Sequence, residues 1–212
     1  MRAFSGFRTW AGFPPTFVAV ALIMSGCGSP GAAVESRARI EIQEEVGFVI
    51  TEEARISNEI RADYAEAMRL LEQGQSTRGI ELLGKAAGDA PQLSAPRIDL
   101  AIIHHRGGDL AAAEEQLQRA LQINPNHPVA HNELGIVYRK SGRFTDARTS
   151  YEAALAIYPD FHFARRNLAI LCDLYLGDMQ CALEQYQAYM GTVPQDDEVE
   201  MWLAEVRNRM DQ

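Results

Sequence analysis

Histidines and cysteines are the side chains of this chain that could hold a metal or carry catalysis, and their spacing limits both roles. His104 and His105 are adjacent, so on a helix they point about 100 degrees apart and do not easily share a metal ion. His127 and His131 are four residues apart, but Pro128 favours a helix that starts after His127, which separates the two rings. We therefore expect no metal site here and interpret His104 as a core residue.

Two of the three cysteines form a possible pair. Cys172 falls late in one predicted helix and Cys181 early in the next, with eight residues between them. Antiparallel helices can bring such positions together, and an even pair in an oxidising compartment tends to be bridged. The sequence leaves two alternatives open, a disulfide and two buried thiols.

No other arrangement of residues suggests catalysis. The sequence contains no Gly-rich phosphate loop, no nucleophile elbow and no grouping of Cys, His and acid. We predict that the protein is not an enzyme and uses no cofactor.

A spacing of 34 residues identifies the elements that position these side chains. Seven positions, Leu100, Ala101, Gly108, Ala113, Leu117, Ala120 and Pro125, return as Leu134, Gly135, Gly142, Ala147, Tyr151, Ala154 and Pro159. A later copy slips by one residue, which indicates an insertion near Gly177. Apolar residues in each half follow helical spacing, Gly marks the turn between halves, and Pro marks the far end. Each copy is thus a predicted helical hairpin that buries its faces by stacking on its neighbours.

The pattern of the best copy resembles a known family. The run Leu134, Gly135, Tyr138, Ala147, Tyr151, Ala154 and Pro159 is similar to the tetratricopeptide repeat, with His131 where the first Trp of that pattern is commonest. The resemblance implies an all-α fold, a right-handed superhelical solenoid of four hairpins over residues 57–195. The two helices of a hairpin are expected to come closest at Gly135.

Two further segments flank the predicted repeats. Residues 39–56 alternate apolar and charged side chains, which is typical of an extended arm. A short strand is not stable alone, so this arm either packs on the first hairpin or pairs with a strand of a partner. Residues 196–212 begin with acidic residues and end with arginines around an apolar stripe, the design of a capping helix that covers the last repeat.

The amino-terminal residues have the pattern of an exported protein. Arg2 and Arg8 precede an apolar stretch, 17–24, that is too short to span a bilayer, so residues 1–26 are a predicted signal peptide. Cys27 follows a small pair and resembles the modified Cys of the bacterial lipobox, whose acyl chains anchor a protein because each buried methylene contributes about 0.8 kcal/mol.

The residues after Cys27 bear on where the protein is held. Residues 27–38 are rich in Gly, Ser and Ala and predict a flexible tether. By resemblance to bacterial sorting rules, Gly28 after the Cys favours the outer membrane, with the protein on its periplasmic face.

The charge of the chain excludes one class of partner. The formal net charge is minus 9, and removal of residues 1–26 would leave 18 basic and 29 acidic residues, a charge of minus 11. Such a surface repels phosphate backbones, so we predict no nucleic-acid binding.

Function is therefore expected on the concave face that stacked hairpins form. The outward positions of the first helices are Tyr64, Met68, Ile98, Ile102, His105, Asn132, Ile136, Arg139, Arg166, Ile170 and Asp173. Long Tyr and Arg side chains are enriched at recognition sites, which favours Tyr64, Arg139 and Arg166 as anchors for a protein or peptide. The alternative for each Ile is that it supports a neighbouring helix.

One known binding mode of the family is not supported. Members that clamp a carboxyl terminus present Lys and Asn at set places, where this chain has Tyr64, Met68, Asp99, Val129 and Glu133.

These expectations combine into one hypothesis, a noncatalytic, lipid-anchored scaffold that binds a protein of an envelope machine. By family resemblance, residues 167–175 and the arm near Phe48 favour a protein that accompanies a TonB-type energy-transducing complex. The alternatives are a pilotin-like lipoprotein of type IV pilus assembly and an activator of a cell-wall synthase.

Overall fold

The computed structural model describes residues 37–43, 47–53 and 56–212. Its elements are β1 (Arg37–Gln43), β2 (Gly47–Glu53), α1 (Asn58–Glu72), α2 (Ser76–Asp89), α3 (Ala95–Arg106), α4 (Leu110–Ile123), α5 (Pro128–Lys140), α6 (Phe144–Ile157), α7 (His162–Leu171), the π-helical turn η1 (Cys172–Leu176), α8 (Met179–Thr192) and α9 (Asp197–Met210). The predicted signal peptide and Cys27 lie outside the described residues.

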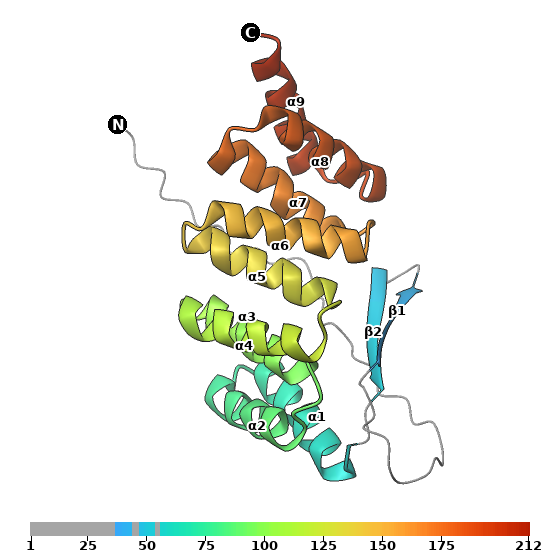
Figure 1. The fold of residues 1–212 in the computed structure, drawn as a ribbon, viewed down its shortest axis with the longest axis vertical. Coiled ribbons are helices and arrows are strands. Elements are labelled where there is room, and N and C mark those ends of the chain that lie inside the picture. Colours follow the sequence, from blue (N-terminus) through green and yellow to red (C-terminus); the bar gives the residue numbers. More distant parts are fainter. Residues whose placement is uncertain (1–36, 44–46, 54–55) are drawn as a thin grey trace.

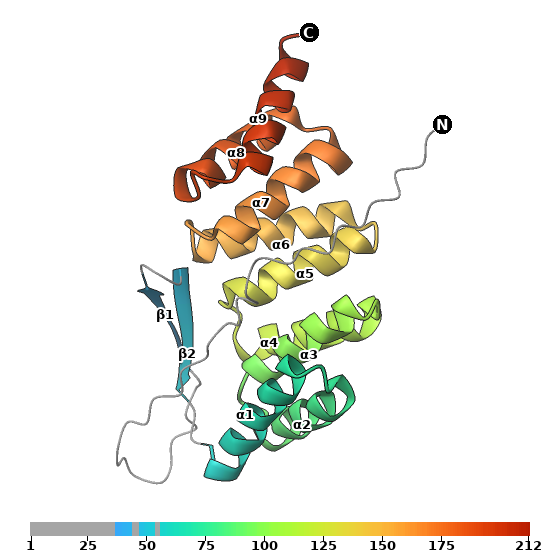
Figure 2. The ribbon, with the colours of Figure 1, turned by 180° about the vertical axis from the view of Figure 1, so that it is seen from behind.

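The helices form four antiparallel hairpins that stack in chain order, followed by α9 (Figure 1). Figure 2 shows the same order of helices from behind, after the molecule is turned by 180° about the vertical axis. The prediction of an all-α solenoid of helical hairpins is confirmed for the repeat region, and a two-stranded sheet precedes it.

The hairpin turns reproduce the repeat register of the sequence. Each turn contains a glycine with positive φ, a conformation in which a Cβ is strained. These glycines are Gly74, Gly108, Gly142 and Gly177. Their spacing is 34, 34 and then 35 residues, so the inserted residue lies before Gly177.

The inserted residue is absorbed by η1. After the turn of the third hairpin, the N–H of Arg143 donates to the carbonyl of Tyr138, which lies five residues earlier. After the turn of the fourth hairpin, the N–H of Asp178 donates to the carbonyl of Cys172, which lies six residues earlier. A π-helical turn accommodates one extra residue within a helix in this way. The fourth hairpin therefore keeps its antiparallel packing despite the insertion.

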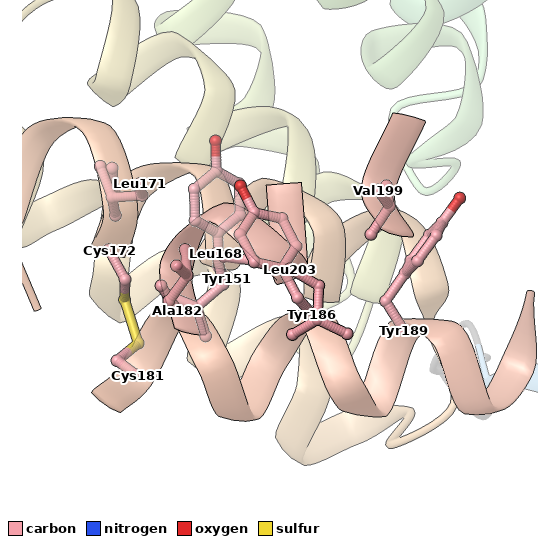
Figure 3. Packing of buried hydrophobic residues seen from close by; sticks show 13 residues of the cluster. Tyr151, Leu168, Leu171, Cys172, Cys181, Ala182, Tyr186, Tyr189, Val199 and Leu203 are labelled. Atoms are coloured by element: carbon pink, nitrogen blue, oxygen red, sulfur yellow. A yellow bond between two sulfur atoms is a disulfide. The ribbon is translucent and has the colours of Figure 1, made fainter. Parts of the chain in front are cut away.

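The core lies between the two helices of each hairpin and between neighbouring hairpins. Gly135 on α5 faces Tyr151 on α6 so closely that a Cβ at Gly135 would lie 2.5 Å from the Cε1 atom of that ring. Tyr151 is fully buried, as is Tyr186 at the matching position of the fourth hairpin. Figure 3 shows Tyr186 beside Leu203 of α9. Small residues thus set the close approach, and tyrosines fill the wider gaps beside them.

The last helix has the capping design expected of residues 196–212. The Asp196 carboxylate caps α9 by accepting from the N–H of Val199 at 3.1 Å. Val199, Leu203 and Val206 are buried against the fourth hairpin, and Arg207 and Arg209 lie in the last turn. The helix therefore covers apolar surface that the last hairpin would otherwise expose.

The segment predicted as one extended arm is a hairpin of two strands. β1 and β2 pair antiparallel, with Ile40 opposite Ile50 and Ala38 opposite Glu52. The two alternating stretches pair with each other because a lone strand leaves its backbone hydrogen bonds unmet.

One buried carboxylate joins this hairpin to the solenoid. Glu52 is 1% exposed and accepts from the N–H of Ser94 at 2.9 Å and of Ala95 at 3.3 Å, and the Ser94 hydroxyl also donates to it. These groups form the amino terminus of α3, where backbone N–H groups lack helical partners and favour an anion. The hydrogen bonds of Glu52 therefore attach the arm to the second hairpin, at the amino terminus of α3.

Candidate functional site

The candidate site is the surface lined by α1, α3, α5 and α7, the first helices of the four hairpins. Successive first helices contact one another, α3 with α5 and α5 with α7, as expected on the inner side of a curved stack. We call this surface the groove. No helix among residues 56–212 is both long and apolar enough to cross a membrane.

The structure buries three of the residues predicted to line the groove. Ile98, Asn132 and Asp173 are 3%, 4% and 9% exposed. Each has a partner within the chain. Ile98 belongs to the apolar cluster that includes Leu134 and Val137, Asn132 accepts from the Asn167 amide, and Asp173 pairs with Arg209 of α9. The others are half-buried: Tyr64, Met68, Ile102, His105, Ile136, Arg139, Arg166 and Ile170.

Polar contacts tie successive first helices together along the groove. The Tyr64 hydroxyl donates to Asp99 at 2.5 Å, and the Asn167 amide donates to the Asn132 side-chain oxygen at 2.9 Å. Burial raises the pKa of Tyr64 well above its usual value, and Asp99 adds to this effect. The Tyr64 hydroxyl is therefore occupied by a hydrogen bond within the chain, and mainly the Tyr64 ring is left to contact a partner.

Two acidic side chains occupy equivalent groove positions one repeat apart. Burial raises the pKa of Asp99 to about 6 and that of Glu133 to about 7. His105 Nδ1 lies 3.8 Å from the Glu133 carboxylate, and burial, with nearby Lys140, lowers the histidine pKa to about 4. The central groove is thus polar, with a neutral imidazole and an acid that titrates near neutral pH.

An exposed patch lies at the end of the groove, where Tyr175 of η1 packs beside Arg139 at the end of α5 and Phe144 at the start of α6. Leu174 is 68% exposed and Tyr175 is 43% exposed. The Tyr175 ring packs 4.9 Å from Phe144, and the Arg139 guanidinium lies 5.7 Å from its centroid. We call Arg139, Leu174 and Tyr175 the η1 patch. It combines exposed apolar surface with a cation, a composition typical of recognition sites.

Of the η1 patch, Arg139 is predicted from the sequence, whereas Leu174 and Tyr175 are not. The signal was present as the one-residue slip of the repeat, because an insertion within a helix turns side chains out of the packed register.

The predicted anchor Arg166 is engaged by the capping helix. Its guanidinium pairs with Glu198 at 2.9 Å and lies 5.2 Å from the centroid of the Trp202 ring. Arg209 pairs with Asp173 in the same region. These contacts fasten α9 to the carboxyl end of the groove.

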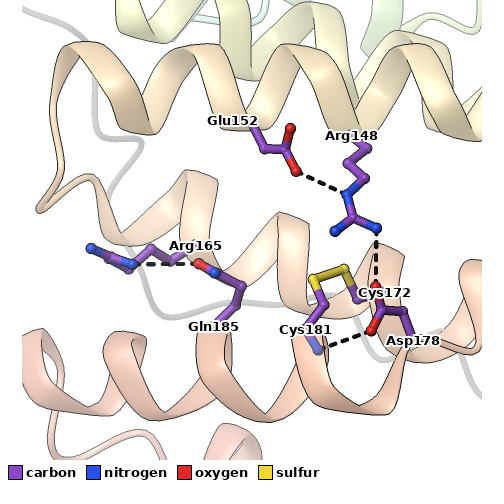
Figure 4. Close-up of a disulfide and its surroundings, with 7 residues drawn as sticks. All are labelled: Arg148, Glu152, Arg165, Cys172, Asp178, Cys181 and Gln185. Carbon is purple, nitrogen blue, oxygen red and sulfur yellow. Dashed lines mark hydrogen bonds and ion pairs between the residues drawn. A yellow bond between two sulfur atoms is a disulfide. The ribbon is translucent and has the colours of Figure 1, made fainter.

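Cys172 and Cys181 are joined by a disulfide, with Cα atoms 5.9 Å apart. Figure 4 shows the surrounding contacts: Asp178 accepts from the N–H of Cys181 at 3.1 Å and from Arg148 at 3.0 Å. The disulfide bond links η1 covalently to the start of α8. It therefore restrains the turn that carries the η1 patch.

Within the part of the chain that the structure describes, metal-ligating side chains converge at Cys172, Asp178 and Cys181 alone. There the two sulfurs are bonded to each other. His127 is the cap of α5: its Nδ1 accepts from the N–H of Ala130 at 3.2 Å, and burial lowers its pKa to about 3. His104 is half-buried.

Solved structures share this architecture at low sequence identity. A MamA fragment from Desulfovibrio magneticus RS-1 is 20% identical, with a TM-score of 0.66 over 74% of this chain and 88% of that one. TTC0263, a thermophilic TPR protein of Thermus thermophilus, is 24% identical, with a TM-score of 0.59 over 70% and 81%. The first TPR of Spaghetti (RPAP3), bound to an HSP90 peptide, is 15% identical, with a TM-score of 0.54 over 57% and 98%. Identities this low show the fold alone.

Family models add evidence from sequence, whereas no curated protein matches the chain. One tetratricopeptide repeat model matches residues 98–160, and another matches 64–128 and 132–197. The second model alone accounts for more than half of the chain. By its repeat register, its stacked hairpins and these matches, the chain belongs to the tetratricopeptide repeat family.

Proposed function

We propose that this protein is a noncatalytic scaffold that holds a protein or peptide partner in its groove. The observation that carries the proposal is the η1 patch, where Leu174 and Tyr175 expose apolar surface beside Arg139. A structural neighbour of the same fold is bound to a peptide, which supports this use of the architecture. Apolar and aromatic surface beside an Arg concentrates binding energy in few residues.

A paired set of substitutions tests the role of the groove. Arg139→Gln with Leu174→Ser removes the cation and the exposed apolar side chain of the η1 patch. Arg119→Gln on α4 with Met201→Ser on α9 makes matched changes elsewhere, since Met201 is 63% exposed and half of the Arg119 side chain is exposed.

We expect the first variant to recover much less partner from an envelope extract, while its helical spectrum stays unchanged. Its melting temperature should fall only slightly, because the variant loses the 3.4 Å hydrogen bond from Arg139 to the Tyr151 hydroxyl. The second should recover as much as the unchanged protein. Equal recovery by both variants would contradict the assignment of the binding face.

We further propose that Cys27 carries a lipid that holds the protein on the periplasmic face of a bacterial outer membrane, within an envelope assembly such as a TonB-type system. The support is sequence: the charged, apolar and small-residue order of residues 1–26, the Cys that follows, and Gly28.

Labelled fatty acid should enter the protein, and Cys27→Ser should abolish labelling and leave the protein soluble in the periplasm. Cys172→Ser serves as the control, since its label should persist. If the Cys27→Ser variant still fractionated with membranes, the proposal of a lipid anchor at Cys27 would be wrong.

A further inference from the structure

The hairpin of β1 and β2 has one edge turned away from the helices. β2 lies between β1 and the helical stack in both views (Figures 1 and 2). Among the described residues, β1 pairs with β2 and with no other strand. An edge strand of seven residues offers a row of backbone donors and acceptors for a further strand.

The register fixes which face of the hairpin meets the solenoid. Positions opposite each other in an antiparallel pair, and positions two apart in a strand, share one face. Glu52 therefore shares its face with positions of apolar type: Ala38, Ile40, Ile42, Phe48 and Ile50. The Glu52 carboxylate is buried against Ser94, so the Glu52 position of this face meets the amino terminus of α3. Pairing at the edge of β1 would leave that contact in place.

We propose that the edge of β1 pairs antiparallel with β1 of a second copy of this chain, about a twofold axis at Ile40. In that register Arg39 of each copy lies opposite Glu41 of the other, and Ile40 lies opposite Ile40. Opposite charges on facing positions stabilise a strand pair, and the contact is self-complementary, as twofold symmetry requires. The interface is independent of the groove.

Neighbouring registers lack this complementarity. Shifting the pairing by two residues sets Arg39 against Arg39 in one direction and Glu41 against Glu41 in the other. A shift by one residue would set apolar positions against charged ones. Charge and face together therefore select one register for self-pairing.

Pairing with a second copy would also stabilise the two-stranded hairpin. Two strands alone are marginal in water, whereas three or more strands with one covered face are stable. Pairing through β1 makes a four-stranded sheet in which each pair is fastened to its own solenoid by Glu52.

Cysteine cross-linking of the full chain in membranes tests the register. Ile40→Cys places two thiols opposite each other across the axis, where facing Cα atoms in an antiparallel pair are about 4.5 to 5.5 Å apart, within reach of a disulfide. Ile50→Cys is the matched control, since position 50 pairs with 40 inside one hairpin and would be about 14 Å from its copy across three strand spacings.

We expect a linked dimer on a non-reducing gel for Ile40→Cys and none for Ile50→Cys or the unchanged chain. Adding Arg39→Glu or Glu41→Arg to Ile40→Cys should reduce the dimer severalfold, and adding both should restore it. Linkage at both cysteine positions, at neither, or without response to the charge changes would overturn the proposal. Melting of each variant checks that the fold is retained.

Discussion

At the scale of single residues, the unusual group is the acid at the centre of the groove. Burial raises the pKa of Glu133 to about 7, although Arg106 and the Asn132 amide favour its ionised form. The ordinary pKa of a glutamate is 4.5, so the folded protein binds this proton more tightly than the unfolded chain does. That contribution to stability is complete below the unfolded pKa and is lost as the pH rises through about 7.

Glu133→Gln should therefore change stability in a pH-dependent way. Gln imitates the protonated acid, so the variant should melt near the unchanged protein at pH 5. At pH 8 it should be more stable by about 1 to 3 kcal/mol, because no ionised carboxylate is enclosed. Thermal melts at both pH values measure this. Glu81→Gln, at an exposed position on α2, is the control, and a pH-independent difference for Glu133→Gln would contradict the assignment.

At the scale of elements, the close contact of α5 with α6 sets the geometry of the hairpin. The ring of Tyr151 occupies the space above Gly135, where any Cβ must displace ring atoms. Gly79 on α2 has a similar neighbour, since a Cβ there would lie 2.6 Å from the Cγ atom of Leu71. Gly84 on α2, in contrast, is exposed, with nothing within 4 Å of an added Cβ. The same substitution therefore has opposite consequences at Gly135 and Gly84.

Gly135→Ala should destabilise the protein by about 1 to 3 kcal/mol, because the enclosed Tyr151 ring must shift. Gly84→Ala should stabilise it by about 0.5 to 1 kcal/mol, because Ala loses less conformational freedom in a helix. Denaturant unfolding of the two variants provides the comparison. If the two variants changed the free energy of unfolding in the same direction, the closest approach of α5 to α6 would not be at Gly135.

At the scale of the whole molecule, stability depends on covering the open end of the stack. Tyr186 and Leu203 belong to one apolar cluster that joins α8 to α9. The pairs of Arg166 with Glu198 and of Arg209 with Asp173 connect α9 to the groove helices as well. In a solenoid each repeat is stabilised mainly by its neighbours, so the last hairpin depends on this helix.

Ending the chain after Gln195 should expose that cluster. Loss of the buried contacts of Val199, Leu203 and Val206 should cost roughly 4 kcal/mol or more and increase binding of a dye that reports apolar surface. Ending the chain after Met210 is the control and should leave melting unchanged. An unaltered melt of the shorter chain would show that the fourth hairpin is stable without its cap.

The sequence alone determined the repeat register, the hairpins and the cap. Helical spacing and the turn glycines are local signals, repeated every 34 residues, and each copy reports the same structure. The slip near Gly177 likewise located the insertion, although it did not show that η1 would expose Leu174 and Tyr175.

Only the tertiary structure decided which groove positions are open and which distant groups meet. Ile98 and Asn132 are buried by contacts with a neighbouring hairpin, and Asp173 by Arg209 of α9, and no single repeat encodes these neighbours. The contact of Glu52 with Ser94 spans 42 residues. It depends on where the second hairpin places the amino terminus of α3, a position in space that local periodicity does not specify.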